Sequence, residues 1–272
     1  MKRAIAFSIA GSDPGGGAGI QQDLRVFTVL NVYGCAAITA LTVQNTLGVQ
    51  ALYPVSGKIL EEQIQAVMED IHPRVIKIGM LATRSNVEAV AKVLSNYTDT
   101  FVVADPVILS KNGVALLNED ALETYVNKLF PLIDLLTPNI PETEKLSGIS
   151  KKHPEFPYIA LMKLRSLLEQ NRSSNRTPSI LLKGGHGSSS TVCRDVLCTN
   201  ERYHVFESSR LTNPHTHGTG CTLSSAIAAF IARGEAVPEA VERARGLVYE
   251  AIRAGFPAGR GTGPVDPMVF LK

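Results

Sequence analysis

The chain has little excess of either charge and no long apolar run. Its 27 Lys and Arg stand against 25 Asp and Glu, a formal net charge of +2, so it offers no concentrated basic face for a nucleic-acid backbone. The apolar run after Arg3 meets Gly11 too soon for a signal peptide. No apolar run approaches the roughly 20 residues of a membrane helix. We therefore expect a soluble, cytoplasmic protein with no nucleic-acid or membrane partner.

Cysteine is also scarce. The four cysteines are Cys35, Cys193, Cys198 and Cys221. A chain of 272 residues does not need disulfides to hold its core together, and Cys193 with Cys198 lacks the paired spacing of a zinc site. Reduced thiols are therefore expected.

What is present is the composition of a globular protein, with 44% hydrophobic and 19% charged residues. Short apolar runs rich in Val and Ile alternate with amphipathic stretches. Runs that are apolar throughout are typical of strands covered on both faces. The expected strands are residues 4–10, 35–42, 75–78, 101–104, 135–137 and 180–182, followed by a shorter pair at 191–197 and 203–207.

Amphipathic segments between and after these runs predict the helices. They are residues 20–30, 60–71, 86–95, 120–130, 142–146, 159–170, 221–233 and 238–254. A repeated βα order favours parallel strands joined by helical crossovers. The sequence therefore predicts an α/β fold, with a mostly parallel central sheet flanked by helices on both faces and residues 1–272 forming one domain.

The segment from His217 to Thr222 reads His-Gly-Thr-Gly-Cys-Thr and runs into an apolar helix. Gly218 and Gly220 allow backbone N–H groups to turn inward, and a helix N-terminus carries about half a positive charge, so the segment predicts an anion site. The same dipole predicts a lowered pKa for Cys221. Taken alone, the segment is better explained as a loop-to-helix junction with a small buried cysteine.

A glycine-rich loop from Gly11 to Gly19 follows the first expected strand. It has neither the spacing of a dinucleotide site nor the Gly-Lys-Ser/Thr ending of a P-loop, but it lies at the carboxyl edge of the sheet, where α/β proteins bind ligands. Met80 alone has an ordinary explanation as core packing. Together, however, several such strand endings predict a ligand site: Thr42-Val43-Gln44-Asn45, Gly79-Met80, Asp105-Pro106-Val107, Thr137-Pro138-Asn139 and Lys183-Gly184-Gly185-His186.

Two segments leave alternatives open. Asn139 with Glu142 three residues later fits a helix capping box, while the same amide and carboxylate suit Mg²⁺ beside phosphates; the two roles are compatible. The tail around Gly259, Gly261 and Gly263 fits either a free end or a loop folded over a ligand.

In order along the chain, these segments resemble the hydroxymethylpyrimidine/phosphomethylpyrimidine kinases, the thiamine-pathway branch of the ribokinase-like superfamily. The resemblance runs nearly end to end. Its motifs are Ala10-Gly11-Ser12-Asp13, Gly16-Gly17-Ala18-Gly19-Ile20-Gln21, Ala37-Ile38-Thr39-Ala40-Leu41-Thr42, Lys77-Ile78-Gly79-Met80-Leu81 and, most specifically, Thr216-His217-Gly218-Thr219-Gly220-Cys221-Thr222. It implies a ribokinase-like fold, a homodimer, and phosphorylation of 4-amino-5-hydroxymethyl-2-methylpyrimidine with ATP and Mg²⁺, first to the monophosphate and then to the diphosphate.

The resemblance also implies roles for single residues. Those that would receive the pyrimidine are Gln44, Val43, Gly11, Ala18, Met80 and Val107, with Asp23 near its polar substituents. Those that would hold the metal are Glu142 and Asp105, and those that would contact the nucleotide are Asn139, Lys183, Gly218 and Gly220. The catalytic set would be Cys221 as base with Gly218, Thr219, Gly220 and Lys183.

Other functions remain in view. The resemblance places an aspartate at the position of Cys221 in sugar and pyridoxal kinases, and cysteine in the pyrimidine kinases. Pyridoxal or pyridoxine phosphorylation is one alternative, because that ring also bears a hydroxymethyl group, and a non-catalytic pyrimidine sensor is another. A sugar kinase is disfavoured by Cys221 and by the mixed pocket. Residues 151–157 and 187–190 match no strong family motif, so a changed lid or nucleotide-side loop is expected there.

Overall fold

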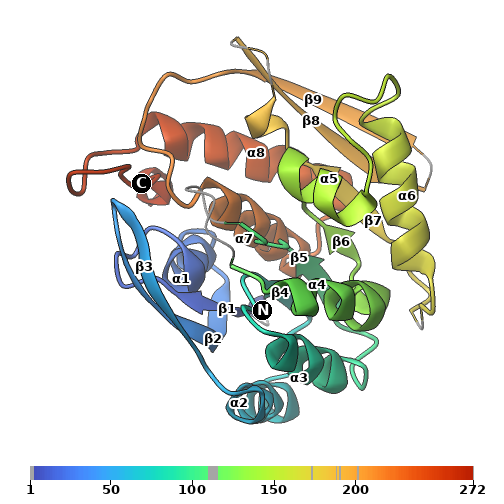
Figure 1. Cartoon of the computed structure of the whole chain (residues 1–272). Helices are drawn as coiled ribbons and strands as arrows, with labels where there is room; N and C mark the ends of the chain where they lie inside the picture. The colour runs from blue at the N-terminus through green and yellow to red at the C-terminus, as the bar shows by residue number, and fades with distance from the viewer. Residues whose placement is uncertain are drawn as a thin grey trace.

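The fold centres on one large sheet (Figure 1). The computed structural model describes residues 3–109, 116–172, 174–187, 189, 191–200 and 202–271. Within them nine strands are ordered β3-β2-β1-β4-β5-β6-β7-β8-β9. Pairing is parallel from β2 to β7 across the sheet and antiparallel at both edges, for β2 with β3, β7 with β8, and β8 with β9. The predicted mostly parallel sheet is confirmed.

The strands are short at the centre and longer at the edges. Their bounds are Ile5–Ser12 (β1), Tyr33–Asn45 (β2), Gly48–Pro54 (β3), Val75–Ile78 (β4), Phe101–Ala104 (β5), Leu135–Leu136 (β6), Ser179–Leu182 (β7), Val192–Thr199 (β8) and Arg202–Ser209 (β9).

Helices cover both faces of the sheet, as predicted (Figure 1). One face carries α1 (Gly19–Val29), α7 (Thr219–Ala232) and α8 (Val237–Arg253). The other carries α2 (Gly57–Asp70), α3 (Arg84–Leu94), α4 (Glu119–Thr124), α5 (Ile140–Ser147) and α6 (Tyr158–Glu169).

Successive strand residues alternate between the two cores. In β4, Ile76 and Ile78 pack on the α2/α3 side, while Val75 packs on the α1/α7 side. Because both faces of the sheet are covered at its centre, nearly every position of β4, β5 and β6 is apolar, which is why these runs showed no alternation. Ser8 in β1 and Lys77 in β4 are polar although they are fully buried. Their spacing from Ala6 and Val75 places them on the α1/α7 side.

Two elements differ from the sequence-based expectation. The helix predicted over residues 120–130 is α4, followed by a π-helical turn at Tyr125–Leu129 and a 3-10 turn at Phe130–Leu132, where Pro131 has no N–H for a regular helix bond. Strand β3 was not predicted, because its residues form no apolar run. It pairs with the outer part of β2, which extends past the expected end at Thr42 to Asn45.

The glycine-rich tail packs against the β2–β3 turn. Thr262 N donates to Thr46 O at 3.0 Å and Gly261 N to Thr46 Oγ1 at 3.1 Å. A Cβ on Gly261 would lie 2.0 Å from Thr46 O, so only glycine fits there. The tail is therefore no free end. Among the described residues, no helix has the length and apolar character needed to cross a membrane.

Candidate active site

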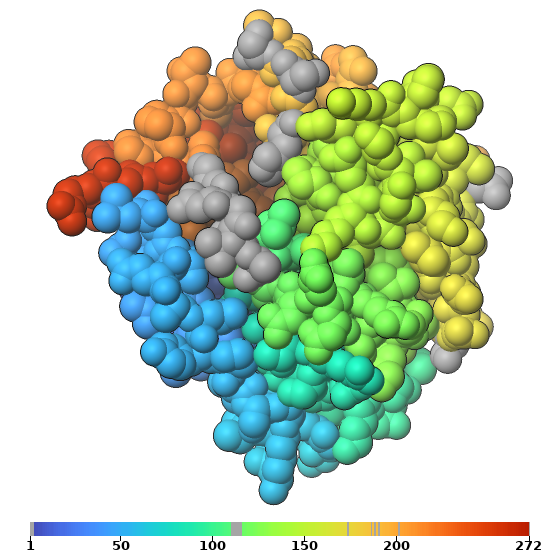
Figure 2. Space-filling view, in the orientation of Figure 1, coloured from blue at the N-terminus to red at the C-terminus, as the bar shows by residue number. Residues whose placement is uncertain are grey.

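The carboxyl edge of the sheet gathers segments that lie far apart in the sequence. A Cβ on Gly11, at the end of β1, would lie 2.3 Å from Met80 Cε after β4. Asn139 forms a bridge with Lys183, and His217 lies against Gln44. Figure 2 shows this face of the molecule hollowed between the blue N-terminal, green and orange C-terminal parts of the chain, which carry these segments. The edge predicted for a ligand site is therefore where these residues meet.

The loop before α7 has the backbone geometry that an anion site needs. Gly218 is the N-cap residue with φ +81°, and a Cβ there would lie 1.8 Å from Gly17 O, so only glycine fits. The helix begins at Thr219, two residues before the predicted start. Thr219 Oγ1 donates to Thr216 O at 2.8 Å, which braces the turn. The positive end of α7 thus lies at the sheet edge.

Cys221 lies in the first turn of α7, and its environment contradicts the predicted lowered pKa. Burial raises the pKa of the thiol to about 11, Asp23 and Asp105 act in the same direction, and Lys77 and the N–H of Gly19 only partly oppose them. The prediction failed because the helix end contributes only about half a positive charge. Its lowering effect on the pKa is smaller than the combined raising effect of burial and of the two carboxylates. Cys221 is therefore a neutral thiol at neutral pH.

Lys183 and Asp105 form an ion pair beside the helix start. Lys183 Nζ lies 2.7 Å from Asp105 Oδ1. A Cβ on Gly220 would lie 3.3 Å from Asp105 Oδ2 and 3.6 Å from Lys183 Nζ, so the pair adjoins the anion loop. Burial by itself would lower the pKa of Lys183, but Asp105 and Glu142 outweigh it and the pKa is raised. A fixed cation therefore stands beside the start of α7.

Glu142 and Asn139 form the predicted capping box at the start of α5. Glu142 N donates to Asn139 Oδ1 at 2.9 Å, and Asn139 N to Glu142 Oε2 at 2.8 Å. Burial raises the pKa of Glu142, and Asp105 adds to the rise against the opposing effect of Lys183.

Two buried carboxylates, Asp105 and Glu142, therefore influence each other at this edge. Within the described ranges no three or more His, Cys, Asp or Glu side chains are placed to hold a metal ion. The two carboxylates alone fit Mg²⁺, which commonly takes one or two carboxylates and completes its shell with phosphates and water.

An apolar surface lines the other side of the hollow. Met80 packs with Ala40 and Leu116, and Val107 lies against the same cluster. Val43 is 44% exposed, and Ala18 lies in the glycine loop, its N–H donating to Asp13 Oδ2 at 2.9 Å. Three of the residues expected around a flat ring, Gly11, Met80 and Val107, thus lie close together, while the contacts of the whole set with a substrate stay predictions.

Asp23 lies beneath the site, and other side chains of the protein already bond its carboxylate. Its carboxylate accepts bonds from Lys77 Nζ at 2.9 and 2.8 Å, and from Ser8 Oγ and Ser225 Oγ at 2.6 Å each. A carboxylate has about four acceptor positions, so a direct bond from Asp23 to a substrate would require one of these to be exchanged. The predicted contact with the pyrimidine stays a prediction.

Three residues at the site were not assigned a role from the sequence. Lys77 and Asp13 are buried charged groups, and His217 joins Asp13 to Gln44. A lysine inside an otherwise apolar strand run, and a histidine directly before the glycines of the anion loop, were the available clues.

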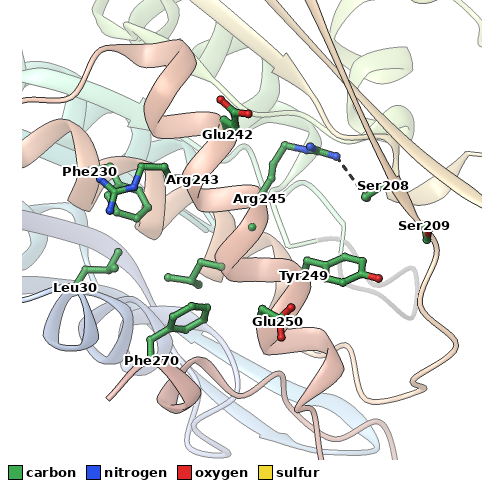
Figure 3. A pocket seen from close by; sticks show the side chains of 12 residues that line it. Leu30, Ser208, Ser209, Phe230, Glu242, Arg243, Arg245, Tyr249, Glu250 and Phe270 are labelled. Carbon is green, nitrogen blue, oxygen red and sulfur yellow. Dashed lines mark hydrogen bonds between the residues drawn. The ribbon is translucent and has the colours of Figure 1, made fainter. Parts of the chain in front are cut away.

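A separate groove of about 690 Å³ lies along α8 (Figure 3). Phe230, Arg243, Tyr249 and Phe270 are among the residues that line it. Arg243 stacks 4.4 Å from the centre of the Phe230 ring. None of the candidate site residues lines this groove, so it is distinct from the sheet-edge site.

Comparison with known sequences identifies close relatives. A family model described as phosphomethylpyrimidine kinase matches residues 13–266. The chain is 40% identical to a hydroxymethylpyrimidine/phosphomethylpyrimidine kinase of Haemophilus influenzae, over 97% of each chain. It is 41% identical to a thiamine biosynthesis bifunctional protein of Geobacter sulfurreducens, over 99% of this chain but only 53% of that protein, so it spans about half the length of that relative.

Solved structures give the same fold. The ADP complex of Bacillus subtilis pyridoxal kinase has a TM-score of 0.87 at 31% identity, covering 100% of both chains. The phosphomethylpyrimidine kinase of Clostridium difficile has a TM-score of 0.77 at 37% identity, covering 92% of this chain and 100% of that one. The fold is therefore ribokinase-like, as the resemblance implied.

Proposed function

The chain belongs to the phosphomethylpyrimidine kinase family, and from that premise we propose the reaction that its site performs. The chain is a phosphotransferase. It transfers the terminal phosphoryl group of ATP to the hydroxymethyl oxygen of 4-amino-5-hydroxymethyl-2-methylpyrimidine, and then transfers a second one to the resulting monophosphate. The observation that carries this proposal is the position of Cys221 in the first turn of α7, next to Gly220, which adjoins the pair of Lys183 and Asp105.

Phosphoryl transfer depends mainly on positioning and on neutralising the charge spread over the transferring oxygens. Lys183 and the N–H groups from Gly218 to Cys221 bind the phosphate oxygens, and Thr219 braces the loop through its bond to Thr216. Asp105 and Glu142 would hold Mg²⁺, which supplies further positive charge when bound. Asn139 sets the position of Glu142 through the capping box and lies beside the nucleotide phosphates.

The ring side of the site selects the substrate. Gln44 supplies a polar amide, and the backbone of Val43, a partly exposed residue, lies next to it in β2. The remaining wall is small or apolar and comprises Gly11, Ala18, Met80 and Val107, with the charge of Asp23 beneath it. A flat heteroaromatic ring fits such a mixed wall better than a polyol does, because most of the surface of the ring is apolar.

Pyridoxal phosphorylation is the second candidate. It is favoured by the likeness to Bacillus subtilis pyridoxal kinase, whose TM-score of 0.87 exceeds the 0.77 of the Clostridium difficile pyrimidine kinase. Sequence identity points the other way, with 31% against 37%. The family match therefore decides for the pyrimidine.

Product analysis tests the function directly. Purified protein with Mg·ATP should convert the pyrimidine alcohol to the monophosphate and, in a separate reaction, the monophosphate to the diphosphate, with ADP formed in equal amount. EDTA should abolish both reactions and added Mg²⁺ should restore them. A larger kcat/KM for pyridoxal than for the pyrimidine alcohol would contradict the proposal, and pyrimidine binding without ADP formation would indicate a sensor.

We further propose that the chain forms one domain, which is supported by the single nine-stranded sheet of the described residues. We also propose that it acts as a homodimer, which is supported by an exposed apolar patch. On β2 and β3, Leu41 and Tyr53 lie directly opposite each other and are 52% and 63% exposed, with Val43 beside them at 44%. A second copy would remove this apolar patch from water. Cytoplasmic location stays a prediction.

The double variant Leu41→Arg/Tyr53→Arg should convert a dimer to a monomer, because two buried cations without partners are costly. Light scattering after size-exclusion chromatography would measure the mass. Met162→Arg on α6, which is 64% exposed, is the matched control and should leave the mass unchanged. A dimer that survives both substitutions would place the interface elsewhere.

A further inference from the structure

Three segments meet at the side chain of His217. Its Nε2 lies 3.0 Å from Asp13 Oδ2 in the glycine loop and 3.2 Å from the side-chain amide nitrogen, Nε2, of Gln44 in β2. These residues are separated by up to 204 positions in the chain. All three belong to the sequence segments that carry the resemblance, which implies no substrate-binding role for Asp13 or His217.

The imidazole is held firmly on both sides. His217 N donates to Gly263 O at 3.1 Å, and Val265 N donates to His217 O at 3.0 Å, so the C-terminal tail fixes its backbone. A Cβ on Gly17 would lie 2.4 Å from His217 Cδ2, which shows how closely the ring packs on the glycine loop. The ring therefore has little freedom to turn.

Gln44 lies beside an irregularity in the neighbouring strand β3. The β2–β3 register shifts between Val43, which pairs with Ala51, and Gln44, which pairs with Val49. The unpaired residue is therefore Gln50 of β3. Successive side chains of a strand point to opposite faces, so Gln44 contacts His217 while its neighbour Val43 is exposed.

The protonation of Asp13 determines which atom of Gln44 faces His217. Burial would raise the pKa of Asp13, but bonds from His217 and from the N–H groups of Gly15 and Ala18 outweigh it and the pKa is lowered. An ionised carboxylate only accepts, so Nε2 of His217 must carry a proton and donate to it. A protonated Nε2 cannot accept from an amide NH2, whereas it can share its proton with an amide oxygen.

We propose that Asp13 and His217 are positioning residues that orient the side-chain amide of Gln44, turning its Oε1 toward His217 and presenting its NH2 to the substrate ring. An NH2 held in this direction selects a ring with an acceptor nitrogen at the matching position and leaves a buried donor unpaired against a ring that lacks one. This orientation exchanges the amide nitrogen and oxygen of Gln44 relative to the placed contact of Gln44 Nε2 with His217. Amide orientation is assigned from the hydrogen-bond network, and an ionised Asp13 that takes the proton of His217 Nε2 requires the exchange. The inference rests on the proposed function only in taking Gln44 as a substrate contact.

His217→Phe tests the role in catalysis, because the ring is kept and its donor is lost. We expect the KM for the pyrimidine alcohol to rise about tenfold or more, with kcat within about threefold and the KM for ATP unchanged. His217→Gln, whose amide NH2 can reach both Asp13 and Gln44, should recover most of the loss. His204→Phe is the matched control, since His204 bonds Thr199 in the β8–β9 hairpin and lies outside the site.

Nitrogen-15 NMR of the histidine rings tests the arrangement without any substrate. Comparison with His217→Phe assigns the resonances, which should show the proton on Nε2. The side-chain NH2 of Gln44 should shift in His217→Phe and not in His204→Phe. Because these signals come from the protein alone, they decide the orientation even if the pyrimidine alcohol proves not to be the substrate.

Three results would overturn the inference. One is a bare Nε2 with the proton on Nδ1. Another is a His217→Gln protein as impaired as His217→Phe. The third is evidence of a structural role only. Such evidence would be a KM for ATP that rises as much as the KM for the pyrimidine alcohol, or a fall in the melting temperature of His217→Phe that accounts for the loss of activity.

Discussion

Replacing Cys221 by alanine should slow the first phosphorylation by about a hundredfold or more and the second by only a few-fold, the size of loss typical of a general base. The first nucleophile is a neutral hydroxymethyl group, which must lose its proton as the new bond forms. The second nucleophile is a phosphate oxygen that is already ionised. Single-turnover rates, measured separately for the two substrates, give the comparison.

The raised pKa of Cys221 adds a pH dependence to this expectation. A thiol with a pKa of about 11 is almost entirely protonated at pH 7, and its thiolate fraction grows about tenfold per pH unit below that value. The first transfer by the unmodified protein should therefore accelerate from pH 7 to pH 10. The same profile should be flat for Cys221→Ala and for the second transfer.

Cys193→Ala is the matched control, because Cys193 is a half-buried free thiol in β8, outside the site. It should leave both rates and the pH profile unchanged. Equal losses of the two transfers in Cys221→Ala, or an alkaline rise that persists without the thiol, would remove Cys221 from the role of base.

Lys77→Met should lower the melting temperature by roughly 6–20 °C. Lys77 and Asp23 form an ion pair with both side chains 0% exposed. Removing one partner of a buried pair leaves an uncompensated charge and costs about 3–5 kcal/mol, and each kcal/mol shifts the midpoint of a chain of this size by about 2–4 °C. Scanning calorimetry of the purified variant provides the measurement.

A second variant separates the charge from the packing. Lys77→Met/Asp23→Asn removes both charges and should recover much of the lost stability, although Ser8 and Ser225 still bond the remaining side chain. Lys92→Met is the control, because Lys92 pairs with Glu61 on the surface and is 69% exposed, where a salt bridge contributes about 0–1 kcal/mol. A Lys77→Met protein as stable as Lys92→Met would contradict the expectation, as would a double variant no better than the single one.

The buried pair also bears on the reaction. Lys77 lowers the pKa of Cys221, while Asp23 raises it. The pKa of Lys77 itself is raised, because Asp23 and the neighbouring acidic groups outweigh the opposing effect of burial. A cation is therefore present under the thiol at neutral pH.

Much of the fold was predictable because its signals are local. The apolar runs of β1, β4, β5 and β7 marked strands buried on both faces, and the helices between them followed from their amphipathic pattern. The capping box at Asn139 and Glu142 involves residues three apart, so the sequence shows it directly. Strand β3 was missed because its pairing with β2 supplies the order that its composition does not indicate.

The sequence by itself determined the βα order, the glycine loop before α7, and the set of polar residues that end the strands at one edge. Those features depend on backbone preferences and on neighbours close in the chain. The tertiary structure alone decided that Cys221 is a neutral thiol, that Asp23 is bound by Lys77, and that His217 joins Asp13 to Gln44. Charges and hydrogen bonds act over a few ångströms, and these distances are set between residues that lie tens to hundreds of positions apart.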